Sequence, residues 1–172
     1  DSGTPSAIGY AQAMGIPFEE GLLKNRYVGR TFIKPSQEMR EVAVRIKLNA
    51  NAKVIQGRRV VMVDDSIVRG TTSSKLVDMV RRCGAKEVHL LISSPPVCYS
   101  CYYGIDTAER ETLVANKMTT EEIRKFVGAD TLYYLSEEGL RRALGGIDAC
   151  LACFTGDYPI EIPKRFNKQE LE

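Results

Sequence analysis

The sequence is short of long hydrophobic runs, of net charge and of histidine. Its 172 residues are 44% hydrophobic and 27% charged, which is ordinary for a globular domain with a buried core. No apolar run approaches the ~18–20 residues of a membrane-spanning helix, and no signal peptide is visible. A net charge of +2 argues against nucleic-acid binding through bulk charge. We therefore expect neither a membrane protein nor a nucleic-acid-binding one, and we interpret the single histidine, His89, as a structural or surface residue.

Strand and helix patterns alternate along the chain. The predicted strands are residues 17–23, 59–63, 87–92 and 132–135. The predicted helices are residues 4–14, 36–46, 72–83, 108–116 and 119–127, with another from Ser136 onward. This alternation indicates βαβ units, and therefore an α/β fold with a parallel sheet flanked by helices. We assign residues 1–144 to this domain and residues 145–172 to an irregular C-terminal tail that carries cysteines.

The most informative stretch is residues 60–72, which opens with an apolar run typical of a buried strand. Two adjacent carboxylates, Asp64 and Asp65, follow it, and a short polar loop then leads into a helix. Ligands of open α/β sheets bind at the carboxyl ends of the strands. A helix N-terminus offers unpaired N–H groups to a phosphate, and carboxylates can bind sugar hydroxyls or a hydrated magnesium ion. The stretch therefore predicts a site for a phosphorylated sugar.

Residues 60–72 resemble the phosphoribosyl pyrophosphate (PRPP) signature of type I phosphoribosyltransferases. That signature has an apolar strand, two acidic residues, a three-residue spacer and a Thr-Gly-x-Thr-like loop. Arg69 stands where most of that family has threonine, and the wording Asp-Asp-Ser-Ile-Val-Arg-Gly-Thr-Thr is similar to one branch, the glutamine PRPP amidotransferases. The resemblance covers nearly the whole chain, and its further stretches are residues 24–33, 94–96, 103–106 and 150–156.

The resemblance implies a type I phosphoribosyltransferase fold and a role for each part of the site. Asp64 and Asp65 would contact the ribose hydroxyls and the magnesium (Mg2+) of bound PRPP, and Ser2 would lie on a magnesium ion. A mobile basic loop, with Lys24, Arg26 and Tyr27 as catalytic residues, would close over the PRPP. The substrate-binding residues that it implies are Asp64, Asp65, Ser66, Ile67, Val68, Arg69, Gly70, Thr71 and Thr72.

Plainer interpretations of these residues stay open on the sequence alone. Asp64 and Asp65 suit an Asx-turn that caps a helix, and the glycine and threonines that follow suit an ordinary strand–helix turn. Ser2 suits a helix cap next to Thr4, the expected N-cap of the first helix. The basic residues after Lys24 suit a solvated surface loop.

The five cysteines of the chain suit a metal site better than disulfides in a cytoplasmic enzyme. Cys150 and Cys153 have the Cys-x-x-Cys spacing of metal sites, of clusters and of redox dithiols, whereas Cys83 is expected in the core. One branch of the amidotransferases carries a structural [4Fe–4S] cluster. The resemblance matches Cys101, Cys150 and Cys153 to three of its ligands, with the fourth ligand outside this chain. Zinc bound by four cysteines, Cys98 included, is the main alternative.

The activity that the resemblance implies is the formation of 5-phosphoribosylamine and pyrophosphate from PRPP, the first step of de novo purine synthesis. Ammonia from glutamine would attack C1 of PRPP through an oxocarbenium-like transition state. The protein would then supply positioning, charge stabilisation and a dry site. The alternatives are a purine-salvage phosphoribosyltransferase and a non-catalytic regulator that binds PRPP or nucleotides.

The resemblance also implies partners and a setting for the chain. Because the sequence starts at Asp1, we expect the first sheet strand and the N-terminal glutaminase domain of the family to lie outside it. Without that domain the chain itself could use only free ammonia. Purine nucleotides are the expected inhibitors, a homo-oligomer is the expected assembly, and the cytoplasm is the expected location.

Overall fold

The computed structural model of the chain describes residues 2–24, 48–105, 107 and 109–162. The helix expected over residues 36–46 lies outside the described residues, as do Arg26 and Tyr27. Of the helices that are described, none is both long enough and apolar enough to cross a membrane.

A parallel sheet of three strands forms the centre of the described structure. The strands are β3 (Arg59–Asp64), β4 (Glu87–Ile92) and β5 (Thr131–Tyr134), in the spatial order β3-β4-β5. His89 lies opposite Thr131 in this sheet, and its Nδ1 forms a hydrogen bond with the Thr131 hydroxyl at 3.0 Å. The prediction of an α/β fold with a parallel sheet is confirmed.

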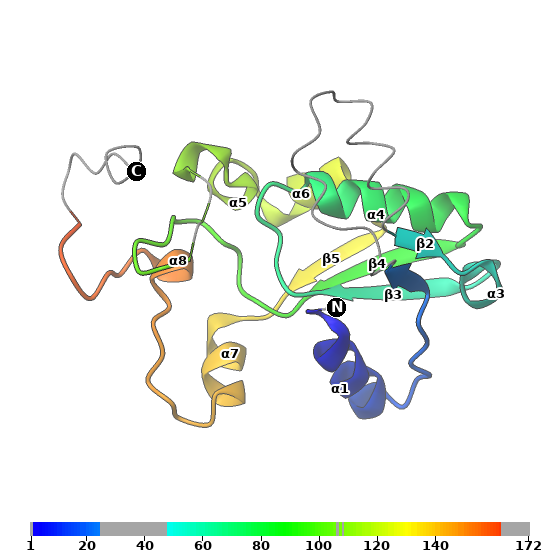
Figure 1. Ribbon diagram of the computed structural model, residues 1–172, viewed down its shortest axis with the longest axis horizontal. Helices are drawn as coiled ribbons and strands as arrows, with labels where there is room; N and C mark the ends of the chain where they lie inside the picture. Colours follow the sequence, from blue (N-terminus) through cyan, green and yellow to red (C-terminus); the bar gives the residue numbers. More distant parts are fainter. Residues whose placement is uncertain (1, 25–47, 106, 108, 163–172) are drawn as a thin grey trace.

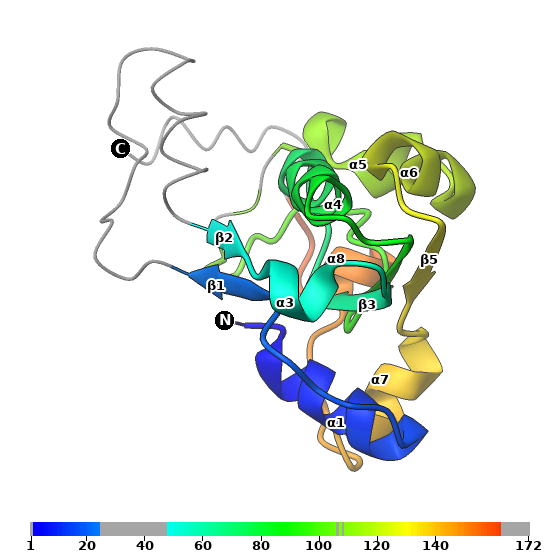
Figure 2. The ribbon, with the colours of Figure 1, turned by 90° about the vertical axis from the view of Figure 1, so that its right-hand side faces the viewer.

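Helices cover both faces of the sheet. α4 (Thr71–Arg82) and α6 (Thr120–Val127) lie on one face, and α1 (Thr4–Met14) and α7 (Glu137–Ala143) lie on the opposite side. Both views show this layering, with α4 above the sheet and α1 below it (Figures 1 and 2). Each of these helices begins within one residue of its predicted start.

The structure also contains short elements that the sequence did not predict. β1 (Leu22–Lys24) and β2 (Leu48–Ala50) form an antiparallel pair, and α3 (Ala52–Ile55) follows β2 directly. The strand expected over residues 17–23 is wrong except at its end, because strand pairing begins only at Leu22. Lys24 was expected in a loop and is instead the last residue of β1.

The helix expected over residues 108–116 is interrupted. A 3₁₀ turn, η2 (Arg110–Thr112), ends at Leu113, whose extended backbone (φ −73°, ψ 122°) separates it from α5 (Val114–Lys117). Leu113 is fully buried, so packing takes precedence over helix continuity at this point. Within the tail, residues 145–162 are largely irregular and contain one helical turn, α8 (Ala152–Thr155).

Local sequence signals set the ends of several helices. Thr119 and Glu122 form a capping box at α6: Thr119 Oγ1 accepts from the Glu122 N–H at 3.3 Å, and the Glu122 carboxylate accepts from the Thr119 N–H at 2.8 Å. Ser136 caps α7 as predicted. The prediction of Thr4 as the N-cap of α1 is wrong, because the Gly3 carbonyl already accepts the first helical hydrogen bond.

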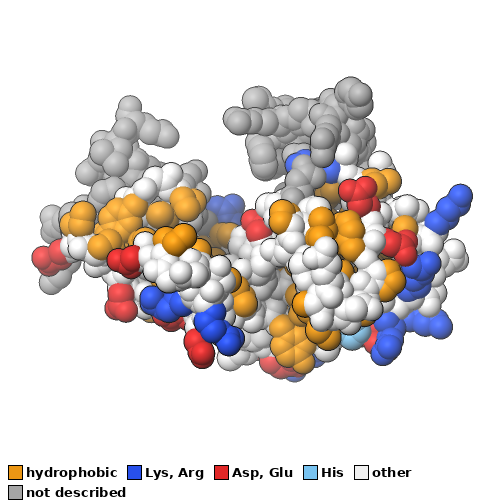
Figure 3. All heavy atoms as spheres, turned by 90° about the horizontal axis from the view of Figure 1, so that it is seen from below, with side chains coloured by type: hydrophobic (Ala, Val, Ile, Leu, Met, Phe, Trp, Pro, Cys, Tyr) orange, Lys and Arg blue, Asp and Glu red, His pale blue; other side chains and the backbone are white. Residues whose placement is uncertain are grey.

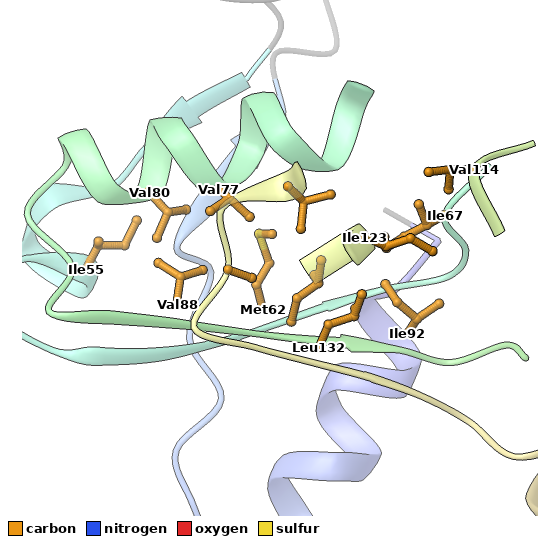
Figure 4. Packing of buried hydrophobic residues seen from close by; sticks show 13 residues of the cluster. Ile55, Met62, Ile67, Val77, Val80, Val88, Ile92, Val114, Ile123 and Leu132 are labelled. Carbon is orange, nitrogen blue, oxygen red and sulfur yellow. The ribbon is translucent and has the colours of Figure 1, made fainter. Parts of the chain in front are cut away.

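The hydrophobic core lies between the sheet and the helices α4 and α6 (Figure 4). Val88 and Leu90 of β4 are completely buried, and Ile123 of α6 is 1% exposed. Cys83 packs against this cluster, as predicted. The other buried members of the cluster are Ile55, Met62, Ile67, Val77, Val80, Ile92, Val114, Val127, Ala129 and Leu132.

Asp130 fastens the start of β5 to β4. Its carboxylate accepts a hydrogen bond from the Val88 N–H at 2.6 Å and another from the Arg81 guanidinium at 2.8 Å. The backbone N–H of Asp130 in turn donates to the Val88 carbonyl at 2.9 Å. The bond from Val88, followed by the charge of Arg81, lowers the pKa of Asp130 because both favour the ionised carboxylate.

We expect Asp130→Asn to lower the free energy of unfolding by about 1 kcal/mol at pH 7. The loss is modest because 38% of the Asp130 side chain is exposed. A lowered native pKa stabilises the fold above the unfolded-state pKa of about 4, and this stability is lost as the pH falls through the native pKa. The two proteins should therefore converge in acid, which urea unfolding at neutral pH and in acid measures. Asp78→Asn, which breaks the exposed pair with Arg82, should change stability by less than ~0.5 kcal/mol.

Candidate functional site

Two carboxylates and a hydroxyl meet at the carboxyl end of β3. Asp64 ends this strand, and its Oδ1 accepts a hydrogen bond from the Asp65 N–H at 3.0 Å. Ser2 Oγ donates to Asp65 Oδ1 at 3.0 Å, although 63 residues separate the two in the sequence. No side chain caps α1, so Ser2 does not serve as the helix cap that its local sequence suggested. The fold therefore brings together the three residues that the sequence assigned to magnesium.

Gly3 allows this close approach between Ser2 and β3. It is buried, and a Cβ at this position would lie 2.7 Å from the Val63 carbonyl oxygen and 3.0 Å from Asp64 Cα. Its φ of −74° is available to any residue, so the space, and not the backbone conformation, requires glycine. Sequence reasoning did not single out Gly3, although it stands directly beside Ser2.

The two carboxyl groups titrate differently. Burial, with the neighbouring Asp65 carboxyl adding to it, raises the pKa of Asp64 to about 6. Burial acts in the same direction on Asp65, but hydrogen bonds to Asp64, to Ser2 and to backbone N–H groups outweigh it and lower the pKa of Asp65. A bound cation would favour the doubly ionised pair. Two carboxylates and a hydroxyl are oxygen donors of the kind that magnesium prefers, so these residues fit that ion.

We expect Asp64→Asn to stabilise the fold at neutral pH. Its native pKa of about 6 lies above the ordinary value of 3.8, so Asp64 contributes stability in acid that is lost as the pH rises through its native pKa. At pH 7 the ionised, half-buried carboxylate costs on the order of 2 kcal/mol, which asparagine of the same shape avoids. Denaturant unfolding at pH values below and above the native pKa of Asp64 measures the effect. Asp148→Asn, at an exposed position, is the control. A variant no more stable than wild type at pH 7 would contradict the argument.

The loop of residues 66–70 leads from β3 into α4 and leaves that helix without a side-chain cap. Gly70 is the N-cap residue and has a φ of 75°, a left-handed conformation that glycine adopts at little cost. The first N–H groups of a helix have no intrahelical partner, and the helix dipole makes them attractive to anions. The carboxylates and an open helix N-terminus therefore lie at the same edge of the sheet.

This loop has one side toward the core and one toward solvent. The Ile67 side chain is 1% exposed and belongs to the core, so of this residue only the backbone is available to a ligand. Asp65, Arg69, Thr71 and Thr72 are exposed. Of the polar side chains that the resemblance assigned to substrate binding, these four lie on the open side, whereas Asp64 and Ser66 are half-buried.

A separate groove of about 1280 Å3 runs between α1 and β3. Gly3, Lys24 and Asp64 are among the residues that line it, so the groove reaches the carboxylate of Asp64. None of residues 66–72 lines it. The groove and the loop are therefore neighbouring features that meet at Asp64. Figure 3 shows the underside of the molecule, the side on which α1 and α7 lie, where apolar side chains gather.

Cys101, Cys150 and Cys153 come near one another where the tail packs on the loop after β4. The N–H groups of Cys98 and Tyr99 both donate to the Cys153 carbonyl, at 3.1 and 3.0 Å. Burial raises the pKa of the Cys153 thiol, and the charges of Cys101 and Cys150 add to this, so the three thiols are within electrostatic reach. All five cysteines are free. Across the described ranges, however, no three metal-binding side chains form a group that could hold a metal ion.

Aromatic contacts that sequence reasoning missed hold the tail in place. A Cβ on Gly156 would lie 2.8 Å from the Tyr99 ring, and the Arg110 guanidinium lies 4.4 Å from the centre of that ring. The Tyr158 hydroxyl donates to the Ser100 carbonyl at 2.7 Å. These contacts join segments far apart in the sequence, and no local pattern signals them.

The chain is similar in sequence to amidophosphoribosyltransferases. It is 59% identical over 168 residues to that of Bacillus subtilis (strain 168) and 58% identical over 162 residues to that of Methanocaldococcus jannaschii, in both cases over 94% of this chain. The chain spans 35% and 34% of these two proteins, about a third of the length of the curated relatives it matches. No family model matches the chain.

Two solved structures share the fold. The glutamine phosphoribosylpyrophosphate (PRPP) amidotransferase from B. subtilis, complexed with ADP and GMP, matches with a TM-score of 0.89 and 56% identity over 100% of this chain and 39% of that one. A structure described as the allosteric regulatory enzyme of purine biosynthesis matches with a TM-score of 0.81 and 59% identity, over 91% of this chain and 35% of that one. At 52–59% sequence identity over most of its length, and in fold, the chain matches one segment of the amidophosphoribosyltransferases.

Proposed function

We propose that this chain is the PRPP-binding part of an amidophosphoribosyltransferase. The reaction transfers an amino group to PRPP and gives 5-phosphoribosylamine and pyrophosphate, the first step of purine synthesis. The observation that carries the proposal is that hydrogen bonds link Asp64, Asp65 and Ser2 beside the open N-terminus of α4. The similarity to amidophosphoribosyltransferases over most of the chain supports it.

In this proposal the site holds PRPP at two ends. The 5′-phosphate lies at the N-terminus of α4, where Thr71, Thr72 and the first backbone N–H groups are donors. Asp64 and Asp65 accept hydrogen bonds from the ribose hydroxyls, and with Ser2 they are the residues that would hold magnesium. When bound, magnesium supplies positive charge that stabilises the leaving pyrophosphate.

The protein has little covalent work in this reaction. Ammonia forms a bond to C1 of the ribose while the bond from C1 to the pyrophosphate oxygen breaks, and that electron pair leaves with pyrophosphate. The excess proton on the new amine passes to solvent. The side chains therefore act by holding the ribose in position and by keeping water, a competing nucleophile, away from C1.

Calorimetric titration with PRPP, with and without magnesium, tests this proposal. We expect magnesium-dependent binding of PRPP and, when ammonia is added, release of pyrophosphate. Ribose 5-phosphate and pyrophosphate titrated separately test the two ends of the site. A folded protein that does not bind PRPP would contradict the proposal. Binding without turnover would favour a non-catalytic regulator, and turnover with a purine base would favour a salvage enzyme.

We propose that Lys24, Arg26 and Tyr27 contribute catalytic groups that close over the pyrophosphate. Lys24 lines the groove that reaches Asp64, which supports its part in this proposal. Arg26 and Tyr27 lie outside the described residues. Replacing each of the three by alanine should lower turnover more than PRPP affinity, because a closing loop acts mainly in the transition state.

In the complete enzyme we propose that ammonia comes from glutamine through a separate glutaminase domain, and that purine nucleotides inhibit. The related B. subtilis structure is complexed with ADP and GMP, which supports the nucleotide part. A nucleotide 5′-phosphate and ribose have the same chemistry as those of PRPP, so a nucleotide can use the same donors and carboxylates. Weaker PRPP binding in the presence of GMP would be the corresponding measurement.

We also propose that Cys101, Cys150 and Cys153 are three ligands of a [4Fe–4S] cluster whose fourth ligand lies outside this chain. Their electrostatic proximity supports this proposal. Because they do not form a ready group of metal ligands among the described residues, the tail or the loop must shift to bind the cluster. The Cys98 thiol donates to the Ala115 carbonyl at 3.6 Å and is left out of the ligand set.

Anaerobic purification followed by assay of iron, sulfide and zinc tests the cysteine proposal. We expect iron and sulfide in the wild type and their loss in Cys150→Ser and Cys153→Ser. Cys98→Ser is the matched control and should keep the iron. Zinc in the wild type that is lost on Cys98→Ser would instead identify a four-cysteine zinc site.

The setting that we propose is a cytoplasmic homo-oligomer. Five free cysteines suit a reducing compartment, which supports the cytoplasmic part. Ile147 and Ile160 expose 70% and 67% of their surface, which suits contact with another subunit. Light scattering of the purified protein would measure the assembly, and a monomer at all concentrations would contradict it.

A further inference from the structure

On its core side, the loop of residues 66–70 is held by contacts with α5 and α6. The Ile67 side chain lies in the core beside those of Val114 and Ile123 (Figure 4). The next carbonyl along the loop, that of Val68, accepts a hydrogen bond from the Val114 N–H at 2.9 Å. Two successive loop residues are therefore tied to α5, and Ile67 also lies beside α6.

A third contact covers Gly70. A Cβ on this residue would lie 2.9 Å from Cε1 and 3.2 Å from Cδ1 of the Phe126 ring. The ring therefore occupies the space on that side of the loop where a side chain would project. Phe126 is 45% exposed, whereas Ile123 and Val127 on the same helix are 1% and 2% exposed. The ring therefore lies against Gly70 at the edge of the core, partly exposed to solvent.

The helix that carries Phe126 is itself held at both ends. The capping box of Thr119 and Glu122 fixes its start. At its other end Arg124 donates to the Ala129 carbonyl at 2.7 Å and pairs with Glu121 at 2.7 Å. α6 packs against α4 and β5, so it gives the loop a firm support.

We propose that α5 and α6 form a back wall that holds residues 66–70 in their anion-binding shape before any ligand arrives. In this arrangement Phe126 and Val114 are positioning residues of the site. A loop with a left-handed glycine loses much conformational entropy when it becomes ordered. If the loop is already ordered in the free protein, ligand binding does not have to supply this free energy. The identity of the anion, PRPP, rests on the proposed function; the support of the loop does not.

Two variants remove the contacts one at a time. Phe126→Ala removes the ring, and Phe126→Leu restores part of its bulk. Val114→Pro removes the N–H that bonds Val68 and also changes a buried side chain. Proline is tolerated here because Val114 is the first residue of α5 and Leu113 before it is already extended. Val114→Ala keeps the N–H and is its control. Tyr133→Ala, which removes an exposed ring on β5, is the control for Phe126→Ala.

Amide hydrogen exchange of the ligand-free protein is the first measurement. We expect Phe126→Ala and Val114→Pro to speed exchange of residues 66–73 roughly 10-fold while β4 stays protected. Phe126→Leu should give an intermediate rate, and Tyr133→Ala should match the wild type. Val114→Ala, which loses part of the side chain but keeps the N–H, should exchange more slowly than Val114→Pro. Unchanged exchange in the loop would overturn the proposal. Faster exchange throughout the protein would also overturn it, since it would show a general loss of stability.

Titration with ribose 5-phosphate and with PRPP is the second measurement. We expect the dissociation constants of both to rise roughly 10-fold in Phe126→Ala, with the dependence on magnesium retained and kcat changed less than KM. Unchanged affinity despite a looser loop would overturn the positioning role. If the wild type itself bound neither compound, the proposed function would fail, and the exchange data would still decide whether the back wall holds the loop.

Discussion

Replacing Asp64 and Asp65 together by asparagine is expected to weaken magnesium-dependent PRPP binding roughly 100-fold or more. Both side chains keep their size, so the loss comes from charge and not from packing. The binding that remains should no longer respond to magnesium, because the neutral amides are poor ligands for it. Calorimetry with and without magnesium separates this result from a general loss of affinity.

The matched control for this variant is a second pair of adjacent carboxylates. Glu137→Gln with Glu138→Gln makes the same change in charge on two exposed residues at the start of α7. It should leave PRPP binding unchanged. If the control weakened binding as much as the Asp64 and Asp65 variant, the effect would reflect net charge, and the site assignment would be wrong.

The same residues show how the proposed site would oppose stability. Asp64 is half-buried, and its burial beside the Asp65 carboxyl raises its pKa. The ionised pair is therefore costly in the free protein and favourable only with a positively charged ligand. Asp64→Asn is accordingly expected to gain stability and to lose function.

The sequence predicted those features that depend on neighbouring residues. β3 was found because a continuous apolar run marks a buried parallel strand. The start of α6 was found because a threonine, Thr119 or Thr120, stands as a cap before Glu121 and Glu122, and the structure shows Thr119 in that role. The carboxylates and the loop were found because strand, acid pair and helix follow one another without a gap.

Features that depend on contacts between distant segments could not be predicted in the same way. β1 pairs with β2 across more than twenty residues, and neither strand is long enough to give a period. The Phe126 ring on Gly70 looks from the sequence like an ordinary residue of an amphipathic helix. Gly3 has an unremarkable φ, so only the approach of β3 reveals why glycine stands there.

Gly3→Ala is expected to lower both stability and PRPP binding. The new Cβ would meet two backbone atoms of β3 at 2.7 and 3.0 Å, and neither can move without disturbing the sheet. The start of α1 must therefore shift, at about 1–3 kcal/mol of unfolding free energy. Ser2 moves with it and loses its bond to Asp65, so PRPP affinity should fall about 10- to 100-fold.

Gly9→Ala makes the same chemical change six residues later and should have the opposite effect on stability. Apart from its chain neighbours and the backbone of its own helix, no atom of the described residues lies within 4 Å of a Cβ at Gly9, which is exposed in the middle of α1. Alanine favours the helix there by about 0.5–1 kcal/mol, and PRPP binding should be unchanged. Urea unfolding and calorimetry of both variants measure the contrast. If Gly3→Ala bound PRPP like the wild type, Ser2 would have no part in the site, and the carboxylates alone would hold the magnesium.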